Sequence, residues 1–207
     1  MTRSAYYEEM RALAREVRRD HGLGTPRVLR SDLRRIYRAY GIRIDLWPYR
    51  LRNLRGAYFN DEHGPTVMLD KTLPDEPAIF TLGHELKHHL VDQDSLLALC
   101  DASNTNEMVE IGAEVFAAEL VFPQADFYEL MQGLGARQGH CPAELIVRLK
   151  RETRTTLSYA ALTKQAEHTG LAPSKSLAAI RWRKLEEQLY GEPEYKKILR
   201  YRQSASR

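Results

Sequence analysis

IFTLGHELKHHLV, residues 79–91, is the stretch from which the fold of this 207-residue chain can be worked out. Apolar residues recur in it at intervals of three and four, as on one face of an α-helix: Ile79, Leu82, Leu86 and Leu90. The residues before it can open a helix, because Asp75 or Glu76 stands near the cap and Pro77 in the first turn. We therefore predict a helix over residues 78–91 whose apolar stripe packs against a core.

The chain on either side of this helix carries two kinds of pattern. Short segments typical of strands occur at residues 42–46, 56–59 and 66–69, with a turn at 60–64. Helices are expected over residues 4–19, 31–40, 104–122, 143–151, 158–167 and 176–190. Helices, a small sheet and then helices alone form the order of an α+β fold rather than of a doubly wound α/β fold. We expect a small mixed sheet packed with the helix over 78–91, and a helical C-terminal region.

Charge divides the chain more sharply than its net value of +3 suggests. Residues 59–140 hold 3 Lys/Arg and 15 Asp/Glu, whereas both flanking regions are basic. Carboxylates gathered in the middle would attract a divalent cation. We predict a core over residues 1–140 and a basic, helix-turn-helix-like helical region over 141–207 that ends in a disordered tail.

Several classes of protein are disfavoured by the composition. No apolar run reaches the roughly 20 residues that span a membrane, and the N-terminus lacks the apolar stretch of a signal peptide. Cys100 and Cys141 have no metal-ligand spacing, and two thiols do not make a disulfide framework. A cytoplasmic protein without a membrane partner is therefore expected.

The central helix contains a pattern with chemical meaning. His84 and His88 stand at i and i+4, so both imidazoles project from one helical face and can reach a single tetrahedral zinc ion. Glu85 lies beside the metal, where it can take a proton from zinc-bound water. His89 points about 100° away around the helix, and we expect a partly exposed or hydrogen-bonded side chain there.

A third ligand is needed, because a catalytic zinc site usually has three protein ligands and an open position. Carboxylates on the helix over 104–122 are the candidates: Glu107, Glu110, Glu114 and Glu119. The first three lie within one stripe, whereas Glu119 lies about 180° from Glu110 and should be solvated or ion-paired. We choose Glu110 as the ligand and Glu114 as an acceptor that orients a histidine N–H. Small residues on this helix should let another helix approach closely: Gly112, Ala113, Ala117 and Ala118.

Two longer motifs contain these residues. FTLGHELKH, residues 80–88, is close to FTLAHELGH, and EIGAEVFAAELVFP, residues 110–123, is similar to the pattern E-x-x-A-N-x-F-A-A-E-L-L-M-P. Gly56–Tyr58 and Val67–Asp70 add a weaker third stretch. Together they resemble the ImmA/IrrE family of metallopeptidases over roughly residues 26–171. Two positions depart from the family's pattern: Glu114 replaces Asn or Asp, and Lys87, which should face away from the metal, replaces glycine.

The resemblance implies a gluzincin-like zinc site with His84, His88 and Glu110 as ligands and Glu85 as general base. It implies that an edge strand over residues 66–69 receives an extended substrate. It also implies a substrate that is a transcriptional repressor, of the helix-turn-helix kind, in a mobile element or a stress response. Tyr128 and His140 could donate to an oxyanion, but the sequence selects neither.

The basic flanks support a different interpretation. A non-proteolytic regulator would use them to bind DNA or a partner and would keep the metal site as a structural or vestigial feature. Nucleic-acid binding is possible but not favoured, since basic residues around Trp182 and Leu185 suit a packing helix. The sequence assigns no oligomeric state, and two histidines with one glutamate suit zinc better than manganese.

Overall fold

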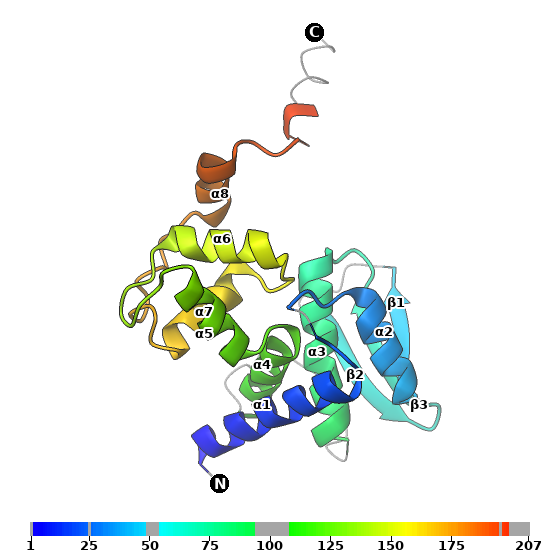
Figure 1. The fold of residues 1–207 in the computed structure, drawn as a ribbon. Helices are drawn as coiled ribbons and strands as arrows, with labels where there is room; N and C mark the ends of the chain where they lie inside the picture. The colour runs from blue at the N-terminus through cyan, green and yellow to red at the C-terminus, as the bar shows by residue number, and fades with distance from the viewer. Residues whose placement is uncertain (1, 25, 49–53, 94–107, 195, 199–207) are drawn as a thin grey trace. The chain divides into compact units, whose positions relative to one another are not determined.

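The computed structural model describes residues 2–24, 26–48, 54–93, 108–194 and 196–198 (Figure 1). The chain forms two compact units. Unit 1 comprises Met1–Phe127 with Thr153–Ser158, and unit 2 comprises Tyr128–Glu152 with Tyr159–Arg207. The division of the sequence at residue 140 stays a prediction.

Unit 1 contains the sheet, which has strands β1 (Arg43–Trp47), β2 (Gly56–Asp61) and β3 (Gly64–Asp70). Their order is β1-β3-β2, with β1 parallel and β2 antiparallel to β3. A small mixed sheet among helices confirms the α+β class. The prediction that residues 66–69 form an edge strand is wrong, because β3 pairs with a neighbour on each side. Its side chains Val67 and Leu69 are accordingly almost fully buried, as those of a central strand are.

Four helices complete the main part of unit 1: α1 (Arg3–Asp20), α2 (Arg30–Ala39), α3 (Asp75–Val91) and α4 (Met108–Val121). Helix α3 packs against the sheet and against α4, which also packs against α1 (Figure 1). Glycines allow these contacts: a Cβ at Gly83 would lie 3.3 Å from the Cβ of Ala117, and one at Gly112 would lie 2.5 Å from the Tyr6 ring. The predicted close approach of a second helix to α4 is confirmed.

Helix α3 is three residues longer at its start than predicted, because Pro74 is its N-cap and Asp75 already belongs to it. Proline without an N–H is tolerated at this end, where helix N–H groups have no partner in the helix. The Tyr37 hydroxyl donates to Leu82 O at 2.6 Å and so ties α2 to α3. The predicted start of α4 at residue 104 lies outside the described residues.

Unit 2 is helical. Its helices are the later part of α5 (Gln124–Gly133), most of α6 (Ala143–Thr153), α7 (Tyr159–His168) and α8 (Trp182–Tyr190). Helix α5 was not predicted, and α8 is shorter than the helix expected over 176–190. Lys175 has φ 61°, and the residues up to Arg181 form successive turns such as Ala178 N–H to Lys175 O. These turns occupy the first part of the predicted helix, so α8 begins only at Trp182.

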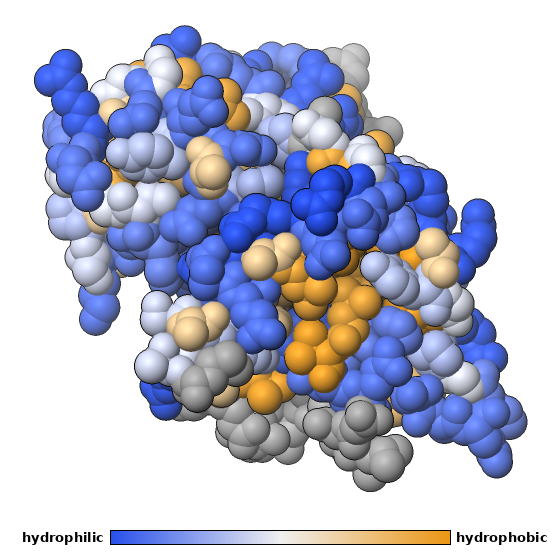
Figure 2. Space-filling view, turned by 60° about the horizontal axis from the view of Figure 1, so that its bottom comes forward, coloured by the Kyte–Doolittle hydropathy of each residue, from blue (hydrophilic) through white to orange (hydrophobic). Residues whose placement is uncertain are grey.

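The face of the molecule in Figure 2 is largely hydrophilic and carries a patch of apolar side chains. Exposed large apolar residues of unit 1 include Leu29, Leu46 and Val91. Within the described ranges, every helix is too short or too polar to cross a bilayer. Cys141 is a free, buried thiol, whereas Cys100 lies outside the described residues.

Candidate metal centre

Helix α3 places His84 and His88 one turn apart on the face that meets α4. Their Nε2 atoms lie 3.2 Å apart, and their rings are edge-on with centroids 5.0 Å apart. His88 is fully buried, and His84 keeps 17% of its side chain exposed. The two imidazoles therefore converge on one point that solvent can reach from the side of His84.

Helix α4 brings Glu110 to the same point. Its Oε2 lies 3.1 Å from His84 Nε2, and its Oε1 lies 3.5 Å from His88 Nε2. Ligand-capable atoms of these three residues lie within 4.8 Å of one another, and no other such group of three occurs in the described parts of the chain. The structure thus brings together the three residues predicted as ligands, from two different helices.

The spacing of the donor atoms fits a metal ion. Zn–N and Zn–O bonds of about 2.0–2.2 Å at tetrahedral angles put two donor atoms roughly 3.3 Å apart. The two Nε2 atoms are 3.2 Å apart, and each lies 3.1 or 3.5 Å from one of the two Glu110 oxygens, so all these distances lie near this value. Two imidazole nitrogens and one carboxylate oxygen suit zinc, whereas magnesium and calcium prefer oxygen ligands alone. The residues present therefore fit a zinc ion better than either of these cations.

Glu85 lies beside this cluster and is almost completely buried, with 2% exposed. Burial raises the pKa of its carboxyl group, although the nearby His84 and His88 and a hydrogen bond from the Tyr58 backbone act in the opposite direction. Its Oε2 is buried and has no hydrogen-bond partner among the described residues. A carboxylate oxygen of this kind is suited to accept a proton from a water molecule at the cluster.

Strand β2 approaches α3 closely at this carboxylate. A Cβ at Gly56 would lie 2.6 Å from Thr81 Cγ2 and 3.4 Å from Glu85 Oε1. Only glycine fits there without displacing one of them. Gly56 belongs to one of the sequence motifs, but its role in letting strand β2 reach the buried Glu85 was not predicted.

Asp92, the C-cap residue of α3, supports His88. Its Oδ2 accepts a hydrogen bond from His88 Nδ1 at 2.8 Å, which leaves the lone pair of that ring on Nε2, the atom that faces the cluster. The sequence analysis missed this residue. Its spacing of i+4 from His88 was the available signal, because residues four apart lie on one helical face.

Burial lowers the pKa of His84, but the hydrogen bond with Glu110 and the charges of Glu85, Glu110 and Glu114 outweigh it, so that this pKa is raised. Glu114 is exposed, one turn after Glu110 on α4. Its predicted contact with a histidine N–H stays a prediction. Glu107 lies outside the described residues.

Two further expectations concern side chains near the site. His89 is buried and its Nδ1 lies 3.1 Å from the Tyr58 hydroxyl, as expected of a hydrogen-bonded histidine outside the cluster. Lys87 directs its ammonium group to Asp92, on the side of His88 away from Nε2. Tyr128 and His140 belong to unit 2, and no role at the cluster is assigned to them.

Comparison with known protein families gives one match. Residues 38–161, more than half of the chain, match the family Peptidase M78, described as the IrrE N-terminal-like domain. The chain belongs to this family. The match contains the whole cluster and Glu85, and it agrees with the ImmA/IrrE resemblance of the two motifs. It makes the chain a member of a metallopeptidase-type family. No curated protein matches the chain.

Proposed function

We propose that this M78 family member is a zinc-dependent endopeptidase that cleaves a regulatory protein. His84, His88 and Glu110 would hold the metal, and Glu85 would act as general base. The proposal rests on the convergence of three ligand atoms from α3 and α4 beside a buried Glu85 oxygen that has no hydrogen-bond partner among the described residues.

The bound metal would polarise the scissile carbonyl and make its water acidic enough to lose a proton near neutral pH. Glu85 Oε2 would take that proton and then pass it to the leaving amine. Burial, which raises the pKa of Glu85, favours this role because the group must hold the proton between the two steps. The Tyr58 backbone fixes the carboxylate through its hydrogen bond.

An extended substrate would bind at the edge of β2 that has no neighbouring strand among the described residues. Asp70 N–H donates to Arg55 O at 3.0 Å, so the alternation of an antiparallel ladder turns the backbone groups of Gly56, Tyr58 and Asn60 away from β3. The backbone groups of Gly56 and Asn60 and the Tyr58 carbonyl could pair with a peptide strand, whereas the Tyr58 N–H already donates to Glu85. The hydrogen bond from Tyr58 to Glu85 puts this edge next to the proposed base.

The substrate class rests on similarity rather than on a contact. The two motifs resemble those of ImmA/IrrE proteins, whose members commonly cleave transcriptional repressors. A helix-turn-helix repressor, cleaved in the cytoplasm as part of transcription regulation in a mobile element or a stress response, is therefore the proposed substrate. Its gene would be expected beside the gene of this chain.

Glu85→Gln tests the mechanism. The zinc-loaded protein is incubated with the repressor encoded next to it, and products are identified by intact mass. We expect the variant to keep its zinc and to cleave at least about 100-fold more slowly, which is the lower range for loss of a general acid–base group. Glu62→Gln, an exposed carboxylate on the β2–β3 turn, is the matched control and should cleave normally. Undiminished cleavage by a zinc-loaded Glu85→Gln protein would overturn the mechanism.

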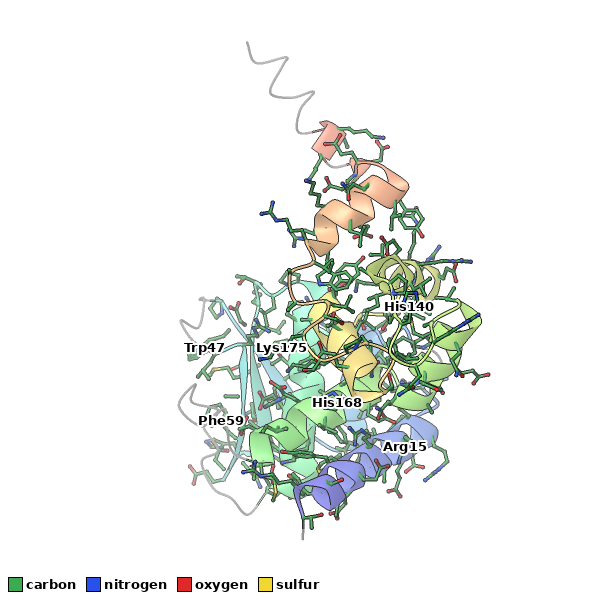
Figure 3. All side chains as sticks on the ribbon, turned by 90° about the vertical axis from the view of Figure 1, so that its left-hand side faces the viewer. Arg15, Trp47, Phe59, His140, His168 and Lys175 are labelled. Carbon is green, nitrogen blue, oxygen red and sulfur yellow. The ribbon has the colours of Figure 1, made fainter. Side chains whose placement is uncertain are left out.

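A hollow in unit 2 favours a second candidate, a regulator that binds nucleic acid. It measures about 410 Å³ and is lined mainly by basic side chains: Arg181, Trp182, Arg183, Lys184, Glu187 and Lys196. Figure 3 shows the side chains of this unit around His140, His168 and Lys175. Binding of the full chain to duplex DNA that weakens steeply with salt, without any cleavage of the repressor, would support this candidate.

A further inference from the structure

Lys87 is fully buried, with 0% of its side chain exposed, and stands directly before His88 in the zinc-binding motif. A lysine is almost never buried in this way unless it is paired, because an isolated ammonium group loses its hydration. The ammonium group of Lys87 is therefore expected to have polar partners, and the structure provides them.

The ammonium group contacts both helices of the candidate metal centre. Lys87 Nζ lies 2.6 Å from Asp92 Oδ2, at the end of α3, and 3.1 Å from Val109 O, in the first turn of α4. It also lies 5.7 Å from the centre of the Tyr6 ring of α1. Val109 immediately precedes Glu110, so one side chain reaches the supports of two proposed ligands.

The oxygen that Lys87 contacts is the one that orients His88. Asp92 Oδ2 accepts both from Lys87 Nζ at 2.6 Å and from His88 Nδ1 at 2.8 Å. The ammonium group thus fixes the carboxylate in place and offsets its negative charge, while the carboxylate keeps the proton of His88 on Nδ1. His88 Nε2 is then left to face His84 and Glu110.

We propose that Lys87 is a positioning residue for the metal site, which acts on His88 through Asp92 and on Glu110 through the Val109 carbonyl. This inference rests on the proposed function, because it concerns the same three ligands. Lys87 itself does not touch the metal or the substrate.

Lys87→Met tests it, because methionine keeps most of the buried stem and removes the ammonium group. Zinc affinity, measured by competition with a chromogenic chelator, should fall about 10- to 100-fold, the usual cost of losing a supporting partner of a metal ligand. The zinc affinity of Asp92→Asn should fall by a similar factor. The double variant should be no weaker than the weaker single variant, because the two residues act in one chain of contacts. Lys71→Met, an exposed lysine before α3, should bind zinc normally.

A spectroscopic measurement separates positioning from packing. In ¹⁵N-histidine spectra of the metal-free protein, His88 should carry its proton on Nδ1 in the wild type and lose that preference in Lys87→Met. Lys87→Gln keeps a hydrogen-bond donor and should lose less affinity; it provides the result if the methionine variant does not fold.

Unchanged affinity and an unchanged His88 spectrum in these variants, with Asp92→Asn still weakened, would overturn the role of Lys87. Losses that add fully in the double variant would do so as well. Failure of the proposed function would give a different result, because His88→Ala and Glu110→Gln would then also leave zinc affinity unchanged.

Discussion

Two carboxylates on opposite faces of α4, the buried Glu119 and the half-buried Glu110, have different surroundings. Glu119 faces α1, where Arg15 Nη1 lies 3.1 Å from its Oε1, and its Oε2 accepts from the Gln124 N–H at 3.0 Å. Glu110 faces α3, where its two oxygens meet the ring nitrogens of two histidines. The first acid has a permanent cation from the chain, whereas the second has groups that are themselves metal ligands.

This difference separates a carboxylate that stabilises the fold, Glu119, from one that is suited to bind a metal, Glu110. An arginine and a backbone N–H satisfy an acid without help from outside. Two imidazole nitrogens together with one carboxylate oxygen instead provide the donor set of a zinc ion. Changes to these two carboxylates should therefore affect metal binding and stability separately.

The largest effect is expected from Glu110→Gln. An amide is a poor zinc ligand, so zinc affinity should fall by more than the roughly 100-fold that loss of a supporting partner can cost. The measurement is competition with a chromogenic chelator. Glu114→Gln, one turn further along the same helix, is the comparison and should lose less. The reverse order would contradict the choice of Glu110 as ligand.

Removal of the metal should affect stability only where the site is intact. Zinc that binds the folded state alone adds about 2.7 kcal/mol to the free energy of unfolding when its free concentration is 100 times Kd. A chelator should remove this increment from the wild type and leave Glu110→Gln unchanged in urea denaturation. An equal loss in both proteins would place the stabilising metal elsewhere.

Glu119→Ala should show the opposite pattern. It leaves the Gln124 N–H without its acceptor and Arg15 without its buried partner, so the free energy of unfolding should fall by about 1–3 kcal/mol. Zinc affinity should stay within about twofold of the wild type, since α4 still presents Glu110. A large loss of zinc with no loss of stability would show that the two faces of α4 are not separate in function.

The smallest effect concerns Cys141, an acid whose pKa is shifted by burial. Burial raises the pKa of the Cys141 thiol to about 11. At pH 8 its reaction with iodoacetamide, followed by site-resolved mass spectrometry, should be on the order of 100-fold slower than that of an exposed thiol. The rate should rise about tenfold per pH unit up to about pH 11, and a rate like that of a free thiol would contradict the burial.

Features that depend on helical periodicity could be predicted from the sequence. The spacing of His84 and His88, and the separation of Glu110 from Glu119, follow from 3.6 residues per turn, and the structure places these side chains accordingly. Strand pairing has no such local signature, so the position of β3 in the centre of the sheet was missed. The roles of Gly56 and Lys87 depend on contacts between elements distant in sequence, and no local pattern reveals these.

The most direct test of the central claim is zinc X-ray absorption spectroscopy on the loaded wild-type protein and on His88→Ala. The wild-type spectrum should show two imidazole nitrogens at about 2.0–2.1 Å, and oxygen ligands at about 2.0–2.2 Å from Glu110 and a water molecule. The variant, at equal zinc occupancy, should show one imidazole. A sulfur ligand, or two imidazoles retained in His88→Ala, would contradict a metal held by His84, His88 and Glu110.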